Sequence, residues 1–318
     1  MITTIAEIRS VLDQRRAAGQ SVGFTPTMGY LHDGHGSLMR AADEANDVVV
    51  ASIFVNPLQF SADEDLDSYP RDLEQDRRLA AQNGVDHLFV PSVGEMYENG
   101  PVLTSVSVAE LSERWDGASR PTHLTGVATV VSKLFNIVGP CRAYFGEKDF
   151  QQLAVIRRMV RDLSMPVEVV GCPIIRESDG LAMSSRNSYL SPADRAAAPV
   201  LRRTLDVGRE LIEQGETDPA TVVAAMTEFI ATEPRARLDY VAVVDPLTLE
   251  TPDRLPTPLE LAASGGHGAG GAAAPIPSAR LLIAAYVGKP RLIDNCPATV
   301  GGDPRGRASM TKAEIDNG

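Results

Sequence analysis

Residues 24–37 read FTPTMGYLHDGHGS and contain two histidines, His32 and His35, separated by an acid and a glycine. An apolar run at 21–25 precedes this stretch, and the spacing predicts a helix from about residue 34 to 46 after it. A strand, a turn and a histidine pair at a helix start favour phosphate binding. The first N–H groups of a helix lack partners within the helix, and imidazole N–H groups can add hydrogen bonds to phosphate oxygens. Taken alone, the spacing is explained equally well by chance or by two surface histidines.

A second stretch far downstream, residues 183–186, reads Met-Ser-Ser-Arg and strengthens the functional interpretation. Two hydroxyls and a guanidinium in sequence can hold the β and γ phosphates of a nucleotide. Without the upstream histidines, a plain serine-rich loop would be the better interpretation. Together, HxGH and MSSR resemble the HIGH and KMSKS signatures of the class I adenylate-forming and nucleotidyl-transferring superfamily.

Five longer sequence blocks narrow the resemblance to one family within this superfamily. In order, they are PTMGYLHDGH (26–35), SIFVNPLQF (52–60), PTHLTGVATVVSKLF (121–135), FGEKDFQQL (145–153) and DGLAMSSRNSYL (179–190). From about residue 3 to 293, the chain is similar to the pantoate–β-alanine ligase family. Gly36 departs from that family's pattern, which has an apolar residue after the second histidine. We expect Gly36 to loosen the packing beneath the histidines without removing their chemistry.

The resemblance implies an ATP-dependent ligase that works in two half-reactions. The pantoate carboxylate attacks the α-phosphorus of ATP and gives pantoyl adenylate and pyrophosphate; the amine of β-alanine then attacks the adenylate and gives pantothenate and AMP. Carboxylate attack on a polyphosphate brings negative charges together, so catalysis must come mostly from positioning and charge stabilisation. The resemblance also implies a homodimer. Mg²⁺ is expected to arrive on the ATP phosphates, because the sequence suggests no cage of protein carboxylates.

The resemblance assigns site residues by position. The catalytic residues it implies are His35, His32, Lys148 and Arg186. The ATP-binding residues it implies are Met28, His32, His35, Gly146, Lys148, Asp149, Ile175, Met183, Ser184, Ser185 and Arg186. Gln59 and Gln152 are expected to bind pantoate, and Asn56 and Tyr69 to contact the phosphates or the entering amine. From the residues alone, a loop hydrogen bond for Gln59 and a surface ion pair for Lys148 and Asp149 remain open.

Strands and helices alternate over residues 1–174 and predict a Rossmann-like, doubly wound parallel sheet, an α/β fold that would bind ATP and pantoate. The continuous apolar run at 48–55 is typical of a strand that is buried on both faces. Ligands of such sheets bind outside the carboxyl ends of the strands, and Asn56, Gln59 and residues 146–149 follow strand ends.

Residues 175–298 predict a smaller α+β C-terminal domain that carries the MSSR loop and closes over ATP as a lid. Its predicted helices are at 192–214 and 218–232, and its strands are at 238–244, 280–287 and 291–294. The Gly/Ala-rich residues 262–279 predict a flexible insertion, and the polar residues 299–318 a disordered tail.

Composition excludes several classes of protein. A formal net charge of −12 argues against a nucleic-acid binder. The sequence has no apolar run near the roughly 20 residues of a membrane span, and no signal-peptide core, so we expect a cytoplasmic protein. Three scattered cysteines have neither the count nor the spacing of a disulfide framework or a zinc site.

The sequence leaves two alternatives open. One is another nucleotidyltransferase of the same superfamily that uses a different small acid; the blocks around Gln59 and Gln152 favour pantoate. The other is a non-catalytic nucleotide-binding protein that kept the fold.

Overall fold

The computed structural model describes residues 1–61, 66–67, 69–98, 102–263 and 277–302 of the 318-residue chain. The chain divides into two compact units, residues 1–175 and 176–318, and each is described by itself. In the part that the structure describes, no helix is both long and apolar enough to cross a membrane.

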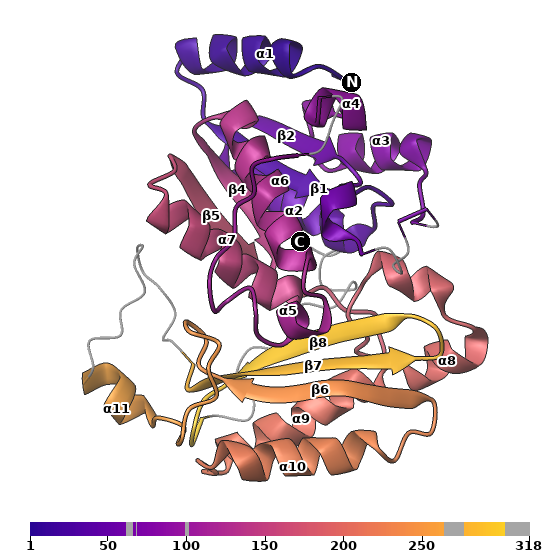
Figure 1. Ribbon diagram of the computed structural model, residues 1–318, viewed down its shortest axis with the longest axis vertical. Helices are drawn as coiled ribbons and strands as arrows, with labels where there is room; N and C mark the ends of the chain where they lie inside the picture. The colour runs from indigo at the N-terminus through magenta and orange to yellow at the C-terminus, as the bar shows by residue number, and fades with distance from the viewer. Residues whose placement is uncertain (62–65, 68, 99–101, 264–276, 303–318) are drawn as a thin grey trace. The chain divides into compact units, whose positions relative to one another are not determined.

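The first unit is built on a five-stranded parallel sheet in the order β3-β2-β1-β4-β5 (Figure 1). Its strands are β1 Val22–Thr27, β2 Val48–Ile53, β3 His87–Phe89, β4 Cys141–Gly146 and β5 Val167–Cys172. The chain runs outward from β1 to β3 and then crosses to β4 on the other side of β1. The strand order therefore reverses between β1 and β4, and ligands of open α/β sheets bind at such a switch point. The predicted doubly wound sheet is confirmed.

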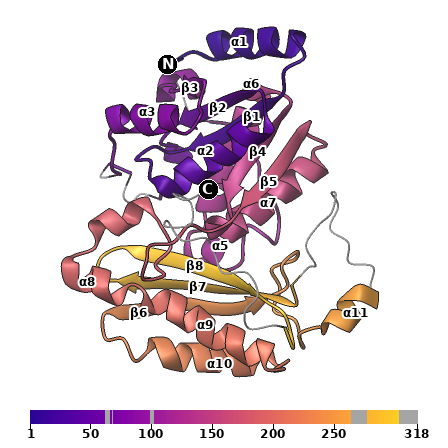
Figure 2. The same cartoon turned by 180° about the vertical axis from the view of Figure 1, so that it is seen from behind.

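Helices cover both faces of this sheet (Figures 1 and 2). The helices of the unit are α1 Ile5–Ala17, α2 Asp33–Ala45, α3 Leu73–Gln82, α4 Val93–Met96, α5 Asp116–Ser119, α6 His123–Val138 and α7 Phe150–Asp162. α2 contacts α3 on one face, whereas α6 contacts α1 and α7 on the other. β2 lies between the two layers, and all six of its residues are buried, as its apolar sequence VVVASI predicts.

β1 differs from its prediction at its end. The apolar run in the sequence ends at residue 25, but the strand continues through Pro26 to Thr27. β1 pairs with β2 along its whole length, from Val22 to Thr27, whereas its register with β4 covers only Gly23 and Phe24. Proline has no N–H to give to a ladder, and by Pro26 the strand has already left β4. β1 and β4 therefore part just before the histidine stretch.

The second unit is an antiparallel sheet in the order β6-β7-β8, packed on helices. Its elements are η3 Ser185–Tyr189, α8 Pro192–Ala197, α9 Val200–Glu213, α10 Pro219–Ile230, β6 Ala236–Val244, α11 Pro258–Ala263, β7 Ala279–Val287 and β8 Arg291–Ala298. α9 contacts β7 and β8, and α10 contacts β6. Leu201 and Leu205 of α9, Met226 of α10, and Leu281 and Ile283 of β7 are buried together in its core.

The single helix predicted at 192–214 is wrong, because the structure has two helices there. α8 ends at Ala197 and α9 begins at Val200, with Pro199 between them as the N-cap of α9. Proline lacks the N–H that a continuous helix needs and clashes with the preceding turn. The break places the apolar face of α9 on the sheet.

Two other predictions fall partly outside the described residues. Residues 264–276 of the predicted insertion and 303–318 of the predicted tail lie there. The described ends of both segments are ordered: residues 262–263 close α11, Ala279 begins β7, and Val300 is buried and donates its N–H to the Ser278 hydroxyl at 3.1 Å.

Candidate active site

His32 and His35 form a reciprocal cap at the start of α2. The Nδ1 of His32 accepts a hydrogen bond from the Gly34 N–H at 3.1 Å, and the Nδ1 of His35 accepts one from the His32 N–H at 3.3 Å. The two rings lie 4.1 Å apart between centroids and are tilted by 43°. This is the arrangement of a capping box, with imidazole nitrogens in place of the usual hydroxyl and carboxylate.

The cap determines which ring nitrogen carries the proton. A nitrogen that accepts a hydrogen bond has no proton, so in the neutral ring the proton sits on the other nitrogen. Both histidines are therefore Nε2–H tautomers. The start of α2 therefore offers two side-chain donors, one from each imidazole ring.

Both rings are held neutral. Burial is the largest cause of the low pKa of His32, followed by the neighbouring His35 and the charge of Lys148. Burial also lowers the pKa of His35 to about 4; Asp149 opposes this shift and Lys148 adds to it. Lys148 and Asp149 thus act electrostatically on the histidine pair, although they follow β4 and the histidines follow β1. The carboxyl ends of the two strands at the switch point bring these four residues together.

The turn before the histidines is held by a buried carboxylate, Asp76, which was not among the residues predicted from the sequence. Gly29 and Tyr30 have φ values of 84° and 50°, and the left-handed region is strained for a residue as large as tyrosine. The carboxylate of Asp76, on α3, accepts the Tyr30 N–H at 2.9 Å and the Leu31 N–H at 2.6 Å. Asp76 is 2 % exposed, and burial raises its pKa against the opposing effect of these two bonds. One sequence signal could have found it: Asp76 lies one helical turn before Ala80 and so on the buried side of α3.

Leu31 anchors the same turn in the core. It is 2 % exposed and packs with Met39, Ile53, Ala80 and Leu88. His32 follows directly, so its backbone is fixed on one side by a buried leucine and on the other by the cap of α2. A core residue and a buried carboxylate together determine where the histidine pair lies.

Gly36 does not loosen the packing beneath the histidines, and that expectation is wrong. Gly36 is buried, and a Cβ at this position would lie 3.0–3.2 Å from the amide atoms of Asn83. Asn83 is held there by its own bond to the Leu79 carbonyl at 2.7 Å and by a hydrogen bond from Arg40. The side chain of Asn83 occupies the space that an apolar residue at position 36 would need.

Gln59 and Met28 meet, with Asn56 beside them. Gln59 is 6 % exposed; its Nε2 donates to the Met28 sulfur at 2.9 Å, and its Oε1 accepts from Asn56 Nδ2 at 3.1 Å. Asn56 is only 1 % exposed, and both ends of its amide have partners. Its Nδ2 donates to Gln59 and also to the Gly126 carbonyl at 3.1 Å, and its Oδ1 accepts from the Tyr97 hydroxyl at 2.8 Å. The predicted contact of Asn56 with an amine or a phosphate stays a prediction, and the occupied amide favours a supporting role instead.

Gly126 allows this arrangement because it has no side chain. A Cβ on Gly126 would lie 2.2 Å from the carbonyl oxygen of Leu58, far inside van der Waals contact. α6 and the short helix η1 Pro57–Gln59 can therefore touch only with glycine at this position. His123, the first residue of α6, also holds η1: its Nδ1 lies 3.0 Å from the carbonyl oxygen of Gln59.

Neighbouring glutamines on α7 have different surroundings. Gln151 is 3 % exposed, and both ends of its amide form hydrogen bonds with the backbone. Its Nε2 donates to the carbonyls of Leu111 and Arg114, each at 2.8 Å. Its Oε1 accepts from the Asp116 N–H at 3.0 Å. Gln152 is half-buried, and the described part of the chain gives its side chain no hydrogen-bond partner. Of the two amides, that of Gln152 is available to a ligand.

The remaining predicted residues of the first unit lie at strand ends or in the core. Gly146 is the last residue of β4, and Lys148 Nζ lies 3.4 Å from Asp149 Oδ1. Ile175 is 6 % exposed and is the last residue of the unit. Tyr69 is 6 % exposed and packs edge-on against Phe60, with ring centroids 5.9 Å apart.

The MSSR loop lies in the second unit. Ser184 caps η3 by accepting the Arg186 N–H at 3.3 Å, and Asn187 donates its own N–H to the Ser184 carbonyl at 3.0 Å. Met183, Ser185 and Arg186 are half-buried. The loop is thus a capped turn with an ordered backbone.

A family model described as pantoate-beta-alanine ligase matches residues 1–297 of the chain. The chain belongs to the pantoate–β-alanine ligase family. Among curated relatives, a pantothenate synthetase of Moorella thermoacetica is 51% identical over 295 residues, which covers 93% of this chain and 97% of the relative. One from Sinorhizobium medicae is 59% identical over 249 residues, 78% of this chain and 85% of the relative.

Solved structures of the family agree. A pantothenate synthetase of Thermus thermophilus has a TM-score of 0.82 and 48% identity and covers 94% of this chain and 99% of its own. A pantoate-beta-alanine ligase from Francisella tularensis has a TM-score of 0.69 and 32% identity, with 96% and 99% covered. The family, the fold and the ligase class predicted from the sequence are confirmed.

The histidine cap makes stability depend on pH in a defined direction. Between the unfolded pKa of about 6.5 and the folded value of about 4, the unfolded chain binds a proton at His35 and the folded chain does not. The free energy of unfolding should therefore fall as pH drops through this range, with His35 contributing up to about 1.4 kcal/mol per pH unit.

Denaturant unfolding at several pH values tests this, with His35→Asn as the comparison. The asparagine oxygen can replace Nδ1 as the acceptor for the His32 N–H but does not titrate. The variant should lose less stability than the wild type between pH 6.5 and 4. Parallel curves for the two proteins would contradict a buried, neutral His35.

Proposed function

We propose that this chain is a pantothenate synthetase, which joins pantoate to β-alanine with conversion of ATP to AMP and pyrophosphate. The observation that carries the proposal is the pair of Nε2–H donors at the start of α2, beside Lys148 at the switch point of a parallel sheet. The Francisella relative, described as a complex with β–γ ATP and β-alanine, supports ATP and β-alanine as two of the substrates.

In the first half-reaction, the pantoate carboxylate attacks the α-phosphorus and pyrophosphate leaves. Negative charge grows on the phosphate oxygens. His32 and His35 donate from Nε2 to these oxygens, and Lys148 adds a full positive charge. Because the two rings are already oriented by backbone N–H groups, little reorganisation is needed as the charge develops.

Gln59 and Gln152 orient pantoate by its hydroxyls and carboxylate. The amide of Gln59 is fixed at both ends, by Met28 and by Asn56, and this leaves one N–H and one lone pair for a ligand. Asn56 therefore acts through Gln59, and the buried Tyr69 supports the same region by packing on Phe60.

Further residues are assigned to the rest of the nucleotide. Asp149 accepts hydrogen bonds from the ribose, while Gly146, Met28 and Ile175 contact the nucleotide through backbone or apolar atoms. Ser184, Ser185 and Arg186, next to Met183, bind the β and γ phosphates. Closure of this loop over ATP shields the adenylate from water. In the second half-reaction the β-alanine amine attacks the adenylate carbonyl and AMP leaves, with no covalent bond to the protein.

Mg²⁺ enters as part of the substrate, with ATP. Among the described residues, no group of three or more His, Cys, Asp and Glu side chains is placed to hold a metal ion. Phosphate oxygens and water are ligands that Mg²⁺ prefers. When bound, the ion neutralises phosphate charge, and the protein residues supply orientation.

We also propose a cytoplasmic homodimer that binds neither nucleic acid nor membrane. ATP as substrate and three free cysteines, Cys141, Cys172 and Cys296, are typical of a reducing compartment. The net charge of −12 disfavours nucleic acid as a partner. The homodimer rests on the family resemblance alone.

Pyrophosphate release in a single turnover tests the function. Enzyme in excess over ATP, with Mg²⁺ and pantoate but no β-alanine, should release pyrophosphate in a burst that requires pantoate. Subsequent addition of β-alanine should yield AMP and pantothenate. Pyrophosphate release only with a different acid would show that pantoate is not the substrate. ATP binding without pyrophosphate release with any acid would contradict the proposed enzymatic activity.

His35→Asn tests the role of the imidazole donor. The variant keeps an acceptor for the cap but has no group at the position of Nε2. Its rate of pyrophosphate release should fall by about 10²–10³-fold, the usual effect of losing a donor to developing charge. Thermal unfolding at pH 8, where His35 is neutral, should be close to that of the wild type. An unchanged burst rate would remove His35 from the mechanism.

The two glutamines of α7 offer a matched pair for the pantoate site. Gln152→Ala should raise the KM for pantoate about tenfold or more, with little change in stability, because its amide serves the ligand. Gln151→Ala should lower the free energy of unfolding by about 1–3 kcal/mol, because it leaves buried carbonyls without a donor. Steady-state kinetics and denaturant unfolding of both variants measure these two effects. A raised KM in Gln151→Ala together with lost stability in Gln152→Ala would contradict the assignment.

A further inference from the structure

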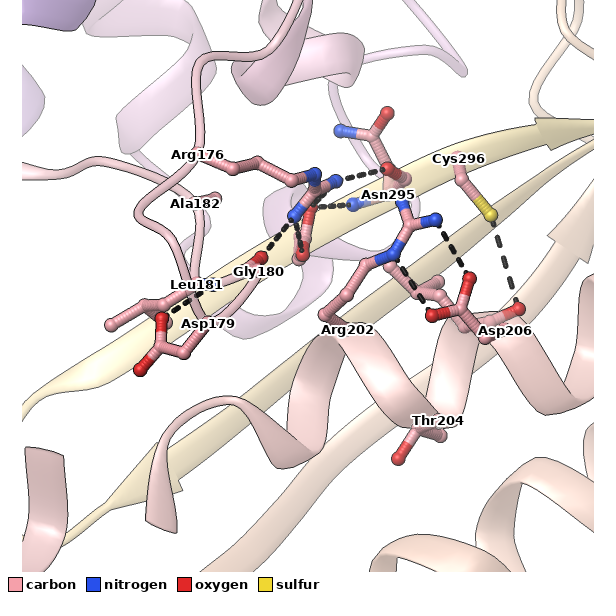
Figure 3. Close-up of polar contacts among 12 residues, drawn as sticks. Arg176, Asp179, Gly180, Leu181, Ala182, Arg202, Thr204, Asp206, Asn295 and Cys296 are labelled. Carbon is pink, nitrogen blue, oxygen red and sulfur yellow. Dashed lines mark hydrogen bonds and ion pairs between the residues drawn. The ribbon is translucent and has the colours of Figure 1, made fainter. Parts of the chain in front are cut away.

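Arg176 is a buried arginine that joins the turn before the MSSR loop to a strand of the second unit. Its side chain is 4 % exposed and forms a two-point ion pair with the equally buried Asp294 of β8, at 2.6 and 2.9 Å. The same guanidinium donates to the Gly180 carbonyl at 3.0 Å and to the Asn295 carbonyl at 3.4 Å. Figure 3 shows Arg176 turned toward Gly180 on one side and Asn295 on the other.

The turn that Arg176 holds ends at Ala182. Arg176 and Ala182 form an antiparallel bridge, and the Glu177 N–H donates to the Leu181 carbonyl at 2.8 Å. Gly180 has a φ of 89°, which suits glycine, and its N–H donates to the Glu177 carbonyl at 2.9 Å. The backbone pairing and the arginine fork therefore fix the same short segment.

Ala182 is also held from its other side. The side chain of Asn187 donates to the Ala182 carbonyl at 3.1 Å, across residues 183–186. Within that span, the Arg186 N–H donates to the Ser184 hydroxyl at 3.3 Å. The four residues form an arch, and both ends of the arch meet at Ala182.

Asp294 gives the arginine a rigid partner. Its Oδ1 accepts the Asn295 N–H at 2.7 Å, and the Asn295 side chain accepts from Arg280 Nε at 2.7 Å. Asn295 and Arg280 are 3 % and 5 % exposed and lie on β8 and β7. Ion pairs this deeply buried add little net stability over well-packed apolar side chains, so stability alone gives no reason for this one.

We propose that Arg176 is a positioning residue for adenylate formation. It ties Ala182 to β8 and thereby sets the backbone of residues 183–186, which bind the polyphosphate of a nucleoside triphosphate. The proposal rests on the proposed function. It assigns Arg176 no contact with substrate: the residue acts through the loop.

The test separates the two half-reactions. Arg176→Lys keeps a positive charge near Asp294 but cannot reach the carboxylate and the Gly180 carbonyl together. Pyrophosphate release at saturating ATP and pantoate should fall 10–100-fold. Amide formation from chemically prepared pantoyl adenylate and β-alanine should stay within about twofold of wild type, because the β and γ phosphates have already left.

Two further variants serve as a control and as a substitute for Arg176→Lys. Arg291→Lys alters another arginine–carboxylate pair of the same sheet, with Asp239 at 2.8 Å, and should leave both half-reactions unchanged. If Arg176→Lys does not fold, the double variant Arg176→Met with Asp294→Leu replaces the ion pair by apolar side chains, which such sites often tolerate. It should show the same selective loss of pyrophosphate release.

Several outcomes would overturn the proposal: pyrophosphate release at the wild-type rate in Arg176→Lys, an equal fall of both half-reactions, or an equal fall in Arg291→Lys. Failure of the proposed function is a different result, because then the wild type itself would release no pyrophosphate with pantoate.

Discussion

The candidate site of the first unit depends on two hydrogen bonds in which backbone N–H groups donate to the Nδ1 atoms of His32 and His35. These bonds satisfy donors that the start of a helix would otherwise leave unpaired. They also force both imidazole protons onto Nε2. One local interaction thus begins the helix and prepares two donors for an anion. Leu31 in the core and Asp76 beneath the turn hold that helix start in place.

The electrostatics of the site follow from burial rather than from net charge. The chain carries a formal charge of −12, yet the switch point presents neutral donors and one lysine. Burial and Lys148 together keep the histidines uncharged. Neutral N–H donors can bind a polyphosphate without the cost of desolvating two further cations. Lys148 remains as the full positive charge of this group, and Asp149 lies beside it at 3.4 Å.

Much of this fold could be predicted from the sequence, because its strands are apolar runs and its helix starts have clear signals. Residues 48–53 of the apolar run at 48–55 form a fully buried strand, and the HxGH stretch forms a helix start. Local rules failed where two signals compete. β1 runs through Pro26 because the strand has left β4 by then, and Pro199 divides a helix that the apolar spacing alone would continue.

The candidate site was less predictable, because a polar side chain reveals its role only through its partners. Gln151 and Gln152 are adjacent and chemically identical, yet one is occupied by backbone groups and the other is available. Asn56 follows a strand end, as a ligand contact would, but its amide is used within the protein. Asp76 and Arg176 bind segments 45 and 118 residues away, at Leu31 and Asp294, and no spacing rule reaches that far.

Nitrogen-15 NMR of the histidine side chains tests the central claim most directly. The chain has five histidines, so His32→Asn and His35→Asn variants would assign the two signals. At pH 7 both rings should be neutral, with the proton on Nε2 and an unprotonated Nδ1, and His35 should remain so down to about pH 5. A proton on Nδ1 in either ring, or a cationic pair at pH 7, would contradict the account.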